Sequence, residues 1–517
     1  MKFQLLALPA AMAVARHPPA RVQSNTSGIA TQDFVQKINH TADSGSATFR
    51  QRYQLNTQHF EPGGPILFVQ SAEAGMATLN TSVFMDYAPK LGALVAMLEH
   101  RFFGDFHGGS YPPGYNPLNI SNDAFDSLTM DNVLQDGVDF VNWIKRTVLG
   151  AANSKVIYSG SSYGGFLAVA ARLHHADTFY GAIASSPALN SFGPLGSNKF
   201  KFDSTKWASD VYDAVSPDAS SKIKAAMLKF KRCIQDRTCD GVLPDLNICK
   251  NSTALGYERL YRAVSHTYLA VSKFNYPWVD KYPTANPLDD LISKTLAATT
   301  ASQVLRIPLL AASWEVSNGS SCINAFNSNI SRASSGSIES SQPAWTYISC
   351  NYYPINDVSI PSDNVLPEAY ARGPVDICLN AAWQRSRDYG RENEYFLQKY
   401  AITNDFLDTT DKLLIVQNSY DRTAAIGSPI LTVTDMLNHS RVILVDGTAH
   451  AEDTVSEAVE PRGLKPQMDQ IRDIKLQHIK EWIGRGNQTQ DSMAALISVH
   501  GSVHVFNFLL VMLLVLL

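Results

Sequence analysis

The segment that most constrains the fold is GSSYG at residues 160–164, which has the spacing G-x-S-x-G. An apolar run at residues 156–158 precedes it, and small and apolar residues follow it at 165–171. This order predicts a strand, a sharp turn and a helix. Such a turn is typical of a nucleophile elbow, because a tight, strained backbone needs small residues beside the serine at its tip, here Ser162.

An elbow serine needs a base and an acid further along the chain, in the order Ser, acid, His. Residues 413–416 read as a buried strand, and Asp421 follows them; residues 441–445 read as the next strand, and His450 follows. Loops after successive strands often carry functional residues. The spacing therefore favours these two residues, with Asp446 and Asp453 as rival acids.

The predicted chemistry is nucleophilic catalysis. Ser162 is a weak nucleophile at its own pKa, so His450 has to take its proton, while Asp421 fixes the tautomer of the imidazole. The backbone N–H of Tyr163 is placed to stabilise a developing oxyanion.

Length, composition and the pattern of apolar runs divide the chain of 517 residues into several parts. We expect a signal peptide at 1–15, the first part of a catalytic core at 31–190, a helical lid insertion at 191–400, the second part of the core at 401–485, and a linker with a hydrophobic tail at 486–517. Short apolar strands alternate with helices in both core parts, which predicts a mainly parallel sheet covered on both faces. All six cysteines lie in the insertion and suggest disulfides, whose pairing is not readable.

Both chain ends point to the secretory pathway. The apolar stretch after Lys2 is short and ends in small residues, as in a signal peptide. The final apolar stretch resembles a glycosylphosphatidylinositol signal, with Ser492 as our choice of attachment residue; a tail-inserted helix is the competing interpretation. Sequons for N-glycosylation stand at Asn25, Asn39, Asn80, Asn119, Asn251, Asn318, Asn329, Asn438 and Asn487.

Several segments resemble the prolyl carboxypeptidase and dipeptidyl peptidase II family of serine peptidases, including its fungal extracellular carboxypeptidase-like members. They are FRQRY at 49–53, EHRFFGD at 99–105, SYGG at 162–165 and SSPA at 185–188. The resemblance implies an α/β-hydrolase fold with a large, mostly helical, disulfide-containing insertion, and it implies the same Ser162, Asp421 and His450. Glu73 matches the glutamate of the family's G-N-E-G segment, so it either positions the substrate or has a structural role. The segment at 99–101 is expected to form a buried polar network rather than to do chemistry.

The chain also departs from this family. Arg422 and Thr423 stand where the family usually has proline and tryptophan, and that tryptophan walls the proline pocket. Ile348 and Tyr352 replace a glutamine and a glutamate of the insertion. The preference for proline is therefore uncertain.

The leading hypothesis is a secreted or surface-anchored serine peptidase, an exopeptidase of the Pro-X carboxypeptidase or dipeptidyl peptidase type. The alternatives are an esterase or lipase on the same triad and a non-catalytic surface-binding protein. No metal or cofactor motif stands out, so no cofactor is expected. A net charge of −4 gives no case for nucleic acid. The expected partners are a peptide or protein substrate and, through the anchor alone, a membrane. The sequence leaves open whether the protein forms a homodimer.

Overall fold

The computed structural model describes residues 29–41, 47–105, 108–116, 119–121, 123–189, 203–243, 246, 254–311, 336–352, 389–402, 404–423, 435–436 and 440–485. The predicted signal peptide and C-terminal tail lie outside these residues. Within the described part, no helix is both long enough and apolar enough to cross a membrane.

The described strands form one nine-stranded sheet in the order β1-β2-β4-β3-β5-β6-β7-β9-β8. Its strands are β1 (Thr31–Lys37), β2 (Thr48–Asn56), β3 (Ile66–Gln70), β4 (Leu94–Leu98), β5 (Val156–Ser161), β6 (Gly181–Ser185), β7 (Leu413–Asn418), β8 (Asp435–Met436) and β9 (Ser440–Val445). The central pairs from β4 through β3, β5, β6 and β7 to β9 are parallel. The strands β1, β2 and β8 pair antiparallel at the two edges.

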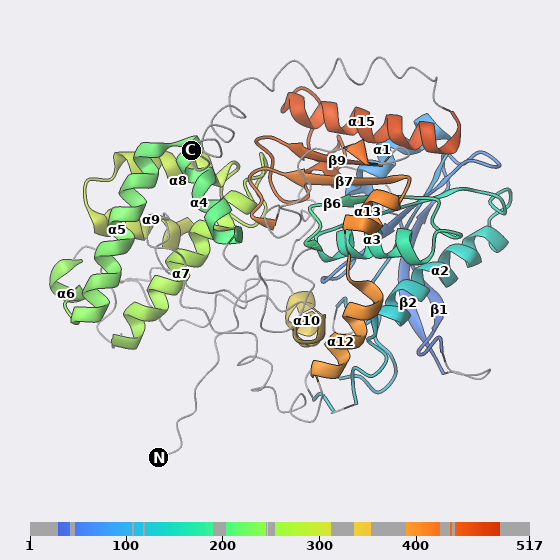
Figure 1. Cartoon of the computed structure of the whole chain (residues 1–517), viewed down its shortest axis with the longest axis horizontal. Helices are drawn as coiled ribbons and strands as arrows, with labels where there is room; N and C mark the ends of the chain where they lie inside the picture. Colours follow the sequence, from blue (N-terminus) through green and yellow to red (C-terminus); the bar gives the residue numbers. More distant parts are fainter. Residues whose placement is uncertain are drawn as a thin grey trace, which may run out of the picture.

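Helices cover both faces of this sheet (Figure 1). One face packs against α1 (Val83–Leu91) and α15 (Pro466–Ile483), and the other against α2 (Met130–Thr147) and α3 (Tyr163–His174). Alternate side chains of each central strand enter the two cores: Ile66 and Phe68 face α2, whereas Leu67 and Val69 face α1. Because both faces are buried, these strands are continuous apolar runs, which is why the sequence revealed them.

Local signals set the helix ends. The Ser82 side chain caps α1 by accepting a hydrogen bond from the Phe84 N–H, and Thr129 caps α2 in the same way through Asn132. Gly92 and Gly484 end α1 and α15 in the left-handed conformation that glycine adopts without steric cost. Short 3₁₀ turns, η1 (Leu79–Thr81) and η6 (Glu452–Thr454), lie in the loops after β3 and β9.

A helical insertion separates β6 from β7. It contains α4 (Asp203–Val215), α5 (Pro217–Asp236), α6 (Cys239–Val242), α7 (Ala254–Lys273), α8 (Pro287–Ala297), α9 (Ala301–Ala311), α10 (Gly336–Tyr352), α12 (Tyr389–Tyr400) and α13 (Asn404–Thr409). The helices α4, α5 and α7–α9 enclose an apolar core of their own, beside the sheet domain. A disulfide between Cys233 and Cys239 joins the end of α5 to α6.

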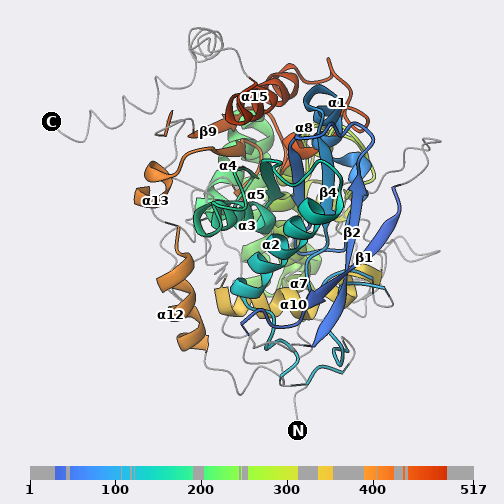
Figure 2. The same ribbon diagram turned by 90° about the vertical axis from the view of Figure 1, so that its right-hand side faces the viewer.

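Two later helices of the insertion, α10 and α12, pack against each other and onto the core beside α3 (Figure 2). The predicted α/β-hydrolase fold with a helical, disulfide-containing insertion is thus confirmed. The sequence did not reveal the antiparallel strands β1 and β2, because polar residues, among them the buried Gln36 and Gln51, interrupt their apolar pattern.

Candidate active site

The backbone of the elbow passes so close to other backbone atoms that glycine is required at two of its positions. Ser162 sits between β5 and α3 with φ 57° and ψ −121°, a strained combination for a residue with a side chain. A Cβ atom on Gly160 would lie 2.1 Å from the carbonyl oxygen of Gly164, and one on Gly165 would lie 2.9 Å from that of Ser185. Only hydrogen fits at these two points, so Gly160 and Gly165 are steric requirements of this turn.

The predicted acid and base meet in the folded chain. The Nδ1 atom of His450 lies 2.5 Å from Oδ2 of Asp421, and both side chains are completely buried. The other carboxylate oxygen, Oδ1, accepts a hydrogen bond of 2.9 Å from the Thr423 N–H. With the carboxylate ionised, Nδ1 carries the proton and donates, which leaves Nε2 of His450 with a lone pair, as a base requires.

Electrostatics keep this pair in the form that catalysis needs. Burial alone would raise the pKa of Asp421, but the His450 ring, the Lys273 ammonium and the Thr423 amide together hold it well below its usual value. Burial lowers the pKa of His450 below 6.5, although Asp421 opposes this effect. The resting state is therefore a carboxylate beside a neutral imidazole.

Ser162 and His450 lie on neighbouring loops tied together by hydrogen bonds. The Ser162 N–H donates to the Ser185 carbonyl at 2.9 Å, and the next hydroxyl, that of Ser186, accepts from the Ala451 N–H at 3.0 Å. The Nε2 atom of His450 is buried and makes no hydrogen bond within the described structure. The hydrogen bond between a nucleophilic serine and its histidine base often forms fully only when substrate is bound.

A buried network beneath these loops fixes their positions. The Asp453 carboxylate accepts hydrogen bonds from the Ser185 hydroxyl and from the Asn418 amide, the latter at 3.0 Å, and it pairs with the ammonium of Lys475 on α15. Asp453 is thus occupied by other partners. The second rival acid, Asp446, is exposed and accepts a hydrogen bond from the Ser419 hydroxyl. Of the three candidate acids, Asp421 is the one that contacts the imidazole.

With this geometry in place, comparison with known proteins identifies the family. The profile described as serine carboxypeptidase S28 matches residues 36–467. The chain belongs to this family of serine carboxypeptidases.

Individual relatives agree with this assignment. The lysosomal Pro-X carboxypeptidase of Bos taurus is 29% identical over 252 residues, which cover 48% of this chain and 49% of that protein. The human protein of the same name is 28% identical over 255 residues, with the same coverage of both chains. A prolyl carboxypeptidase-like protein of Caenorhabditis elegans is 30% identical over 264 residues, 48% of each chain. This chain thus spans about half the length of the curated relatives it matches.

The signature at 99–101 forms the expected buried polar network. The Arg101 guanidinium binds the Asp136 carboxylate, with Nε 2.7 Å from Oδ2. The Nδ1–H of His100 donates to the Arg101 carbonyl at 2.7 Å, and its Nε2 accepts from the Tyr163 hydroxyl at 3.2 Å. Burial lowers the pKa of His100 to about 4, so the ring is neutral at neutral pH. It supports the elbow from below through Tyr163.

Glu73 lies close to the elbow. Its loop follows β3, and a Cβ on Gly164 would come within 3.2 Å of the neighbouring Ala72 side chain. Burial raises the pKa of Tyr163 well above its usual value, and the charge of the Glu73 carboxylate raises it further. The Tyr163 N–H belongs to the first turn of α3, where helix amides point out of the helix end. The assigned roles of Glu73 and of this amide remain predictions.

Sequence reasoning missed Lys273, the last residue of α7. Its carbonyl oxygen accepts the His450 N–H at 2.8 Å, and its ammonium donates to the Thr423 hydroxyl at 3.0 Å. The sequence signal is a single lysine that stands two residues after the apolar run at 268–271. Only the fold brings this helix end to the triad.

The residues that depart from the family pattern have defined contacts in the structure. Thr423 is buried and holds Asp421 through its amide. Ile348 and Tyr352 of α10 are buried in the main core, and the Tyr352 ring lies 5.0 Å from that of Phe396. These two positions therefore contribute packing where the family has polar groups.

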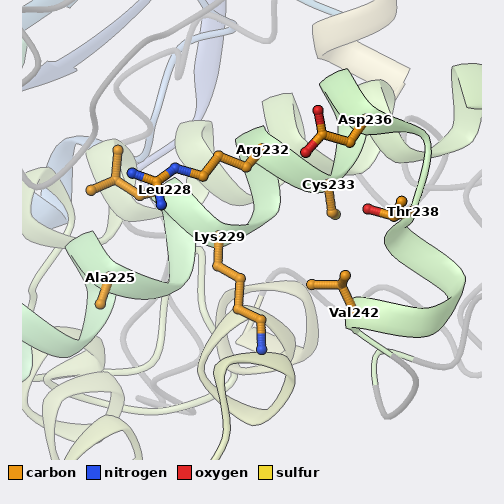
Figure 3. Close-up of a pocket in the computed structure, with 8 residues that line it drawn as sticks. All are labelled: Ala225, Leu228, Lys229, Arg232, Cys233, Asp236, Thr238 and Val242. Atoms are coloured by element: carbon orange, nitrogen blue, oxygen red, sulfur yellow. The ribbon is translucent and has the colours of Figure 1, made fainter.

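The remaining sites predicted from the sequence are the sequons for N-glycosylation. Asn39 and Asn119 are exposed and Asn80 is half-buried; the sequons at Asn25, Asn251, Asn318, Asn329, Asn438 and Asn487 lie outside the described residues. No group of three or more His, Cys, Asp or Glu side chains in the described ranges is arranged to hold a metal ion. A surface pocket between α5 and α6 (Figure 3) is separate from the triad, and its lining has no serine or histidine: Ala225, Leu228, Lys229, Arg232, Cys233, Asp236, Thr238 and Val242.

Proposed function

We propose that this protein is a serine exopeptidase that hydrolyses peptide bonds through an acyl-enzyme. The observation that carries the proposal is the buried contact between His450 Nδ1 and Asp421 Oδ2, beside a strained elbow that presents Ser162. An orienting carboxylate, a neutral imidazole and a serine on such a turn are what acyl transfer requires.

The reaction follows from these groups. The Ser162 oxygen attacks the scissile carbonyl while Nε2 of His450 takes its proton, and the oxyanion is stabilised by the Tyr163 N–H. The imidazolium then protonates the leaving amine, which departs and leaves an ester on Ser162. A water molecule, deprotonated by His450, hydrolyses that ester and restores the serine hydroxyl.

The proposed specificity is broader than strict cleavage after proline. Thr423 occupies the position of the tryptophan that walls the proline pocket in the family, and its hydroxyl is bound to Lys273. Loss of one apolar wall changes pocket selectivity by about 1–3 kcal/mol. We therefore propose acceptance of small apolar residues beside proline at the cleavage site.

The proposed location is outside the cell, in solution or held by a lipid anchor. The sequence-predicted signal peptide, the sequons and the Cys233–Cys239 disulfide support export through an oxidising compartment. Expression in a eukaryotic host, followed by analysis of medium and membranes with and without phosphatidylinositol-specific phospholipase C, tests this. Retention of the protein inside cells would contradict it.

The activity is tested by mass spectrometry of products from a peptide set at acidic and neutral pH. Each peptide carries proline, alanine or phenylalanine second from either end or in the interior. We expect cleavage near one end, absent in Ser162→Ala and present in the control Ser221→Ala, a change at an exposed serine on α5. Turnover of simple esters without any peptide cleavage would favour an esterase instead.

A further inference from the structure

The loop that follows β3, residues 71–76, lies against the catalytic elbow and is called the β3 loop below. A Cβ atom on Gly164 would lie 3.2 Å from the Cβ of Ala72 and 3.4 Å from the carbonyl oxygen of Gln70. In α/β-hydrolases the oxyanion is bound by the amide after the nucleophile and by a second amide from the loop in this place. The position of the β3 loop therefore bears on the chemical step at Ser162.

Both ends of the β3 loop are attached to the end of β4. At its start, the Ser71 N–H donates to the Leu98 carbonyl at 3.0 Å. At its end, the Met76 N–H donates to Oε1 of Glu99 at 2.9 Å. Leu98 and Glu99 are successive residues, and β4 pairs with β3 in parallel. The Glu99 side chain thus holds the far end of the loop as the β4 backbone holds its near end.

Glu99 is itself held in one place. Its side chain is completely buried, and Oε2 accepts a hydrogen bond from the Ser110 hydroxyl at 2.8 Å. A Cβ atom on Gly104 would lie 2.8 Å from the same oxygen, so this side of the carboxyl group is closely packed. Ser110 is anchored in turn, because its hydroxyl oxygen accepts the Arg52 N–H of β2 at 2.9 Å. The carboxyl group is therefore a fixed point of attachment for the loop.

An acceptor that only held the loop in the fold would not need a charge. Burial raises the pKa of Glu99 to about 7, and the Arg52 guanidinium, whose Nη1 lies 3.8 Å from Oε1, opposes this effect. The Asp105 carboxylate raises the pKa further. Burying an ionisable group is unfavourable, and a glutamine would bind the same amide without that cost. What the carboxylate adds is strength, because a hydrogen bond to an ionised acceptor is about twice as strong as one to a neutral acceptor.

We propose that Glu99 is a positioning residue: by holding the β3 loop against the elbow, its carboxylate speeds the chemical step without contributing to substrate binding. The inference rests on the proposed acyl transfer at Ser162. It gives the glutamate of the 99–101 segment an effect on the reaction, although its oxygens bond to Met76 and Ser110 rather than to a reacting atom.

The test compares four variants of the full-length protein with the wild type at about pH 8, where Glu99 is ionised and His450 is neutral. Glu99→Ala removes the acceptor, whereas Glu99→Gln keeps an oxygen for the Met76 amide and loses the charge. Ser110→Ala removes the other partner of the same carboxylate and leaves the bond to the loop. Glu394→Ala removes an exposed glutamate on α12.

Each variant is characterised by kcat and KM for a chromogenic peptide and by the inhibition constant of the matching peptidyl trifluoromethyl ketone. The ketone forms a tetrahedral adduct with the catalytic serine, so its oxygen occupies the place of the oxyanion and its affinity follows transition-state stabilisation. Rates are expressed per active site, titrated to completion with a fluorophosphonate, which excludes misfolded protein.

For Glu99→Ala we expect kcat to fall by about 10- to 100-fold, less than the loss of about 10²- to 10³-fold on removal of an oxyanion donor itself. The inhibition constant rises in parallel, and KM stays within about twofold. Glu99→Gln has a smaller effect, about three- to tenfold, because a neutral acceptor binds the amide more weakly. Ser110→Ala and Glu394→Ala leave kcat per active site within about twofold.

Unchanged kcat and inhibition constant in Glu99→Ala would refute the inference. Equal losses in Glu99→Ala and Ser110→Ala would do the same, because they would indicate general damage. If Glu99→Ala does not fold, Glu99→Gln decides, and wild-type constants in that variant would contradict the proposed role. Absence of Ser162-dependent peptide cleavage by the wild type would refute the proposed function instead; the inference would then be judged by the rate at which a fluorophosphonate labels Ser162 in the same variants.

Discussion

Replacing Asp421 by asparagine tests the assignment of the triad most directly. The two carboxylate oxygens have different partners: Oδ1 accepts the Thr423 N–H at 2.9 Å, and Oδ2 receives the His450 Nδ1–H at 2.5 Å. An asparagine that keeps its oxygen on the Thr423 amide has to turn its NH₂ group toward Nδ1. The imidazole then accepts at Nδ1 and carries its proton on Nε2, where it has no lone pair for the Ser162 proton.

The opposite orientation of this asparagine is less favourable. It sets the NH₂ group against the Thr423 N–H and leaves a buried donor unsatisfied, which costs about 1–3 kcal/mol. The inactive tautomer is therefore preferred by about 5- to 150-fold. The variant also loses the negative charge that stabilises the imidazolium. Because of both effects, we expect kcat to fall by about 10⁴-fold, as for the same change in other serine protease triads. This corresponds to about 5–6 kcal/mol in the activation free energy.

The assay is the rate of acyl-enzyme formation with a chromogenic peptide, together with the rate of labelling of Ser162 by a fluorophosphonate. The control is Asp446→Asn, because Asp446 is an exposed acid that follows the same strand as His450. We expect wild-type rates for the control. A loss below about tenfold for Asp421→Asn, with unchanged thermal unfolding, would show that another acid orients the base.

Three further predictions concern the surroundings of the site. Burial lowers the pKa of His450 below 6.5 and the Lys273 charge lowers it further, so the acid limb of the kcat/KM profile should fall below pH 6.5 and move to higher pH in Lys273→Met. Lys475→Met should lower the free energy of unfolding in urea by about 3–5 kcal/mol, because it leaves the buried Asp453 carboxylate without its cation. Gly160→Ala should destabilise the protein by about 3 kcal/mol and abolish activity, since its Cβ would lie 2.1 Å from a carbonyl oxygen of the elbow.

Matched controls separate these effects from general damage. Lys206→Met removes a lysine whose side chain is 60% exposed, and we expect a change within about 0.5 kcal/mol. Gly241→Ala adds a Cβ that meets no atom within 4 Å and should leave stability and activity unchanged. An acid limb above pH 6.5, or equal effects of a variant and its control, would contradict the corresponding prediction.

The central strands and the elbow were predictable because their causes are local. Strands β3, β4, β5 and β7 are buried on both faces and therefore appear as apolar runs. The elbow needs glycine at fixed spacings, so the requirement is visible in the sequence. The strands β1 and β2 were not found, since polar residues, among them the buried Gln36 and Gln51, break their apolar pattern and both strands depend on their neighbours for pairing.

The candidate site was predictable only where chain order carries the chemistry. Ser162, Asp421 and His450 follow successive strands, and parallel strands bring their carboxyl ends to one edge of the sheet. The choice of Asp421 over Asp453 depended on distances, because both acids are buried near the same loops. The position of Lys273 depended on the path of α7, about 150 residues before Asp421 in the chain.

The sequence by itself determined the elbow, the strand-and-helix order and the residues able to perform nucleophilic catalysis, since steric and periodic constraints act between near neighbours. The tertiary structure alone showed the contact between Asp421 and the imidazole, which the sequence had only favoured, and it alone brought Lys273 beside that pair. These contacts form where the end of α7 meets the loops that follow β7 and β9. There Lys273 is hydrogen-bonded to His450 and to Thr423. Burial there sets the protonation states, and burial depends on the whole chain.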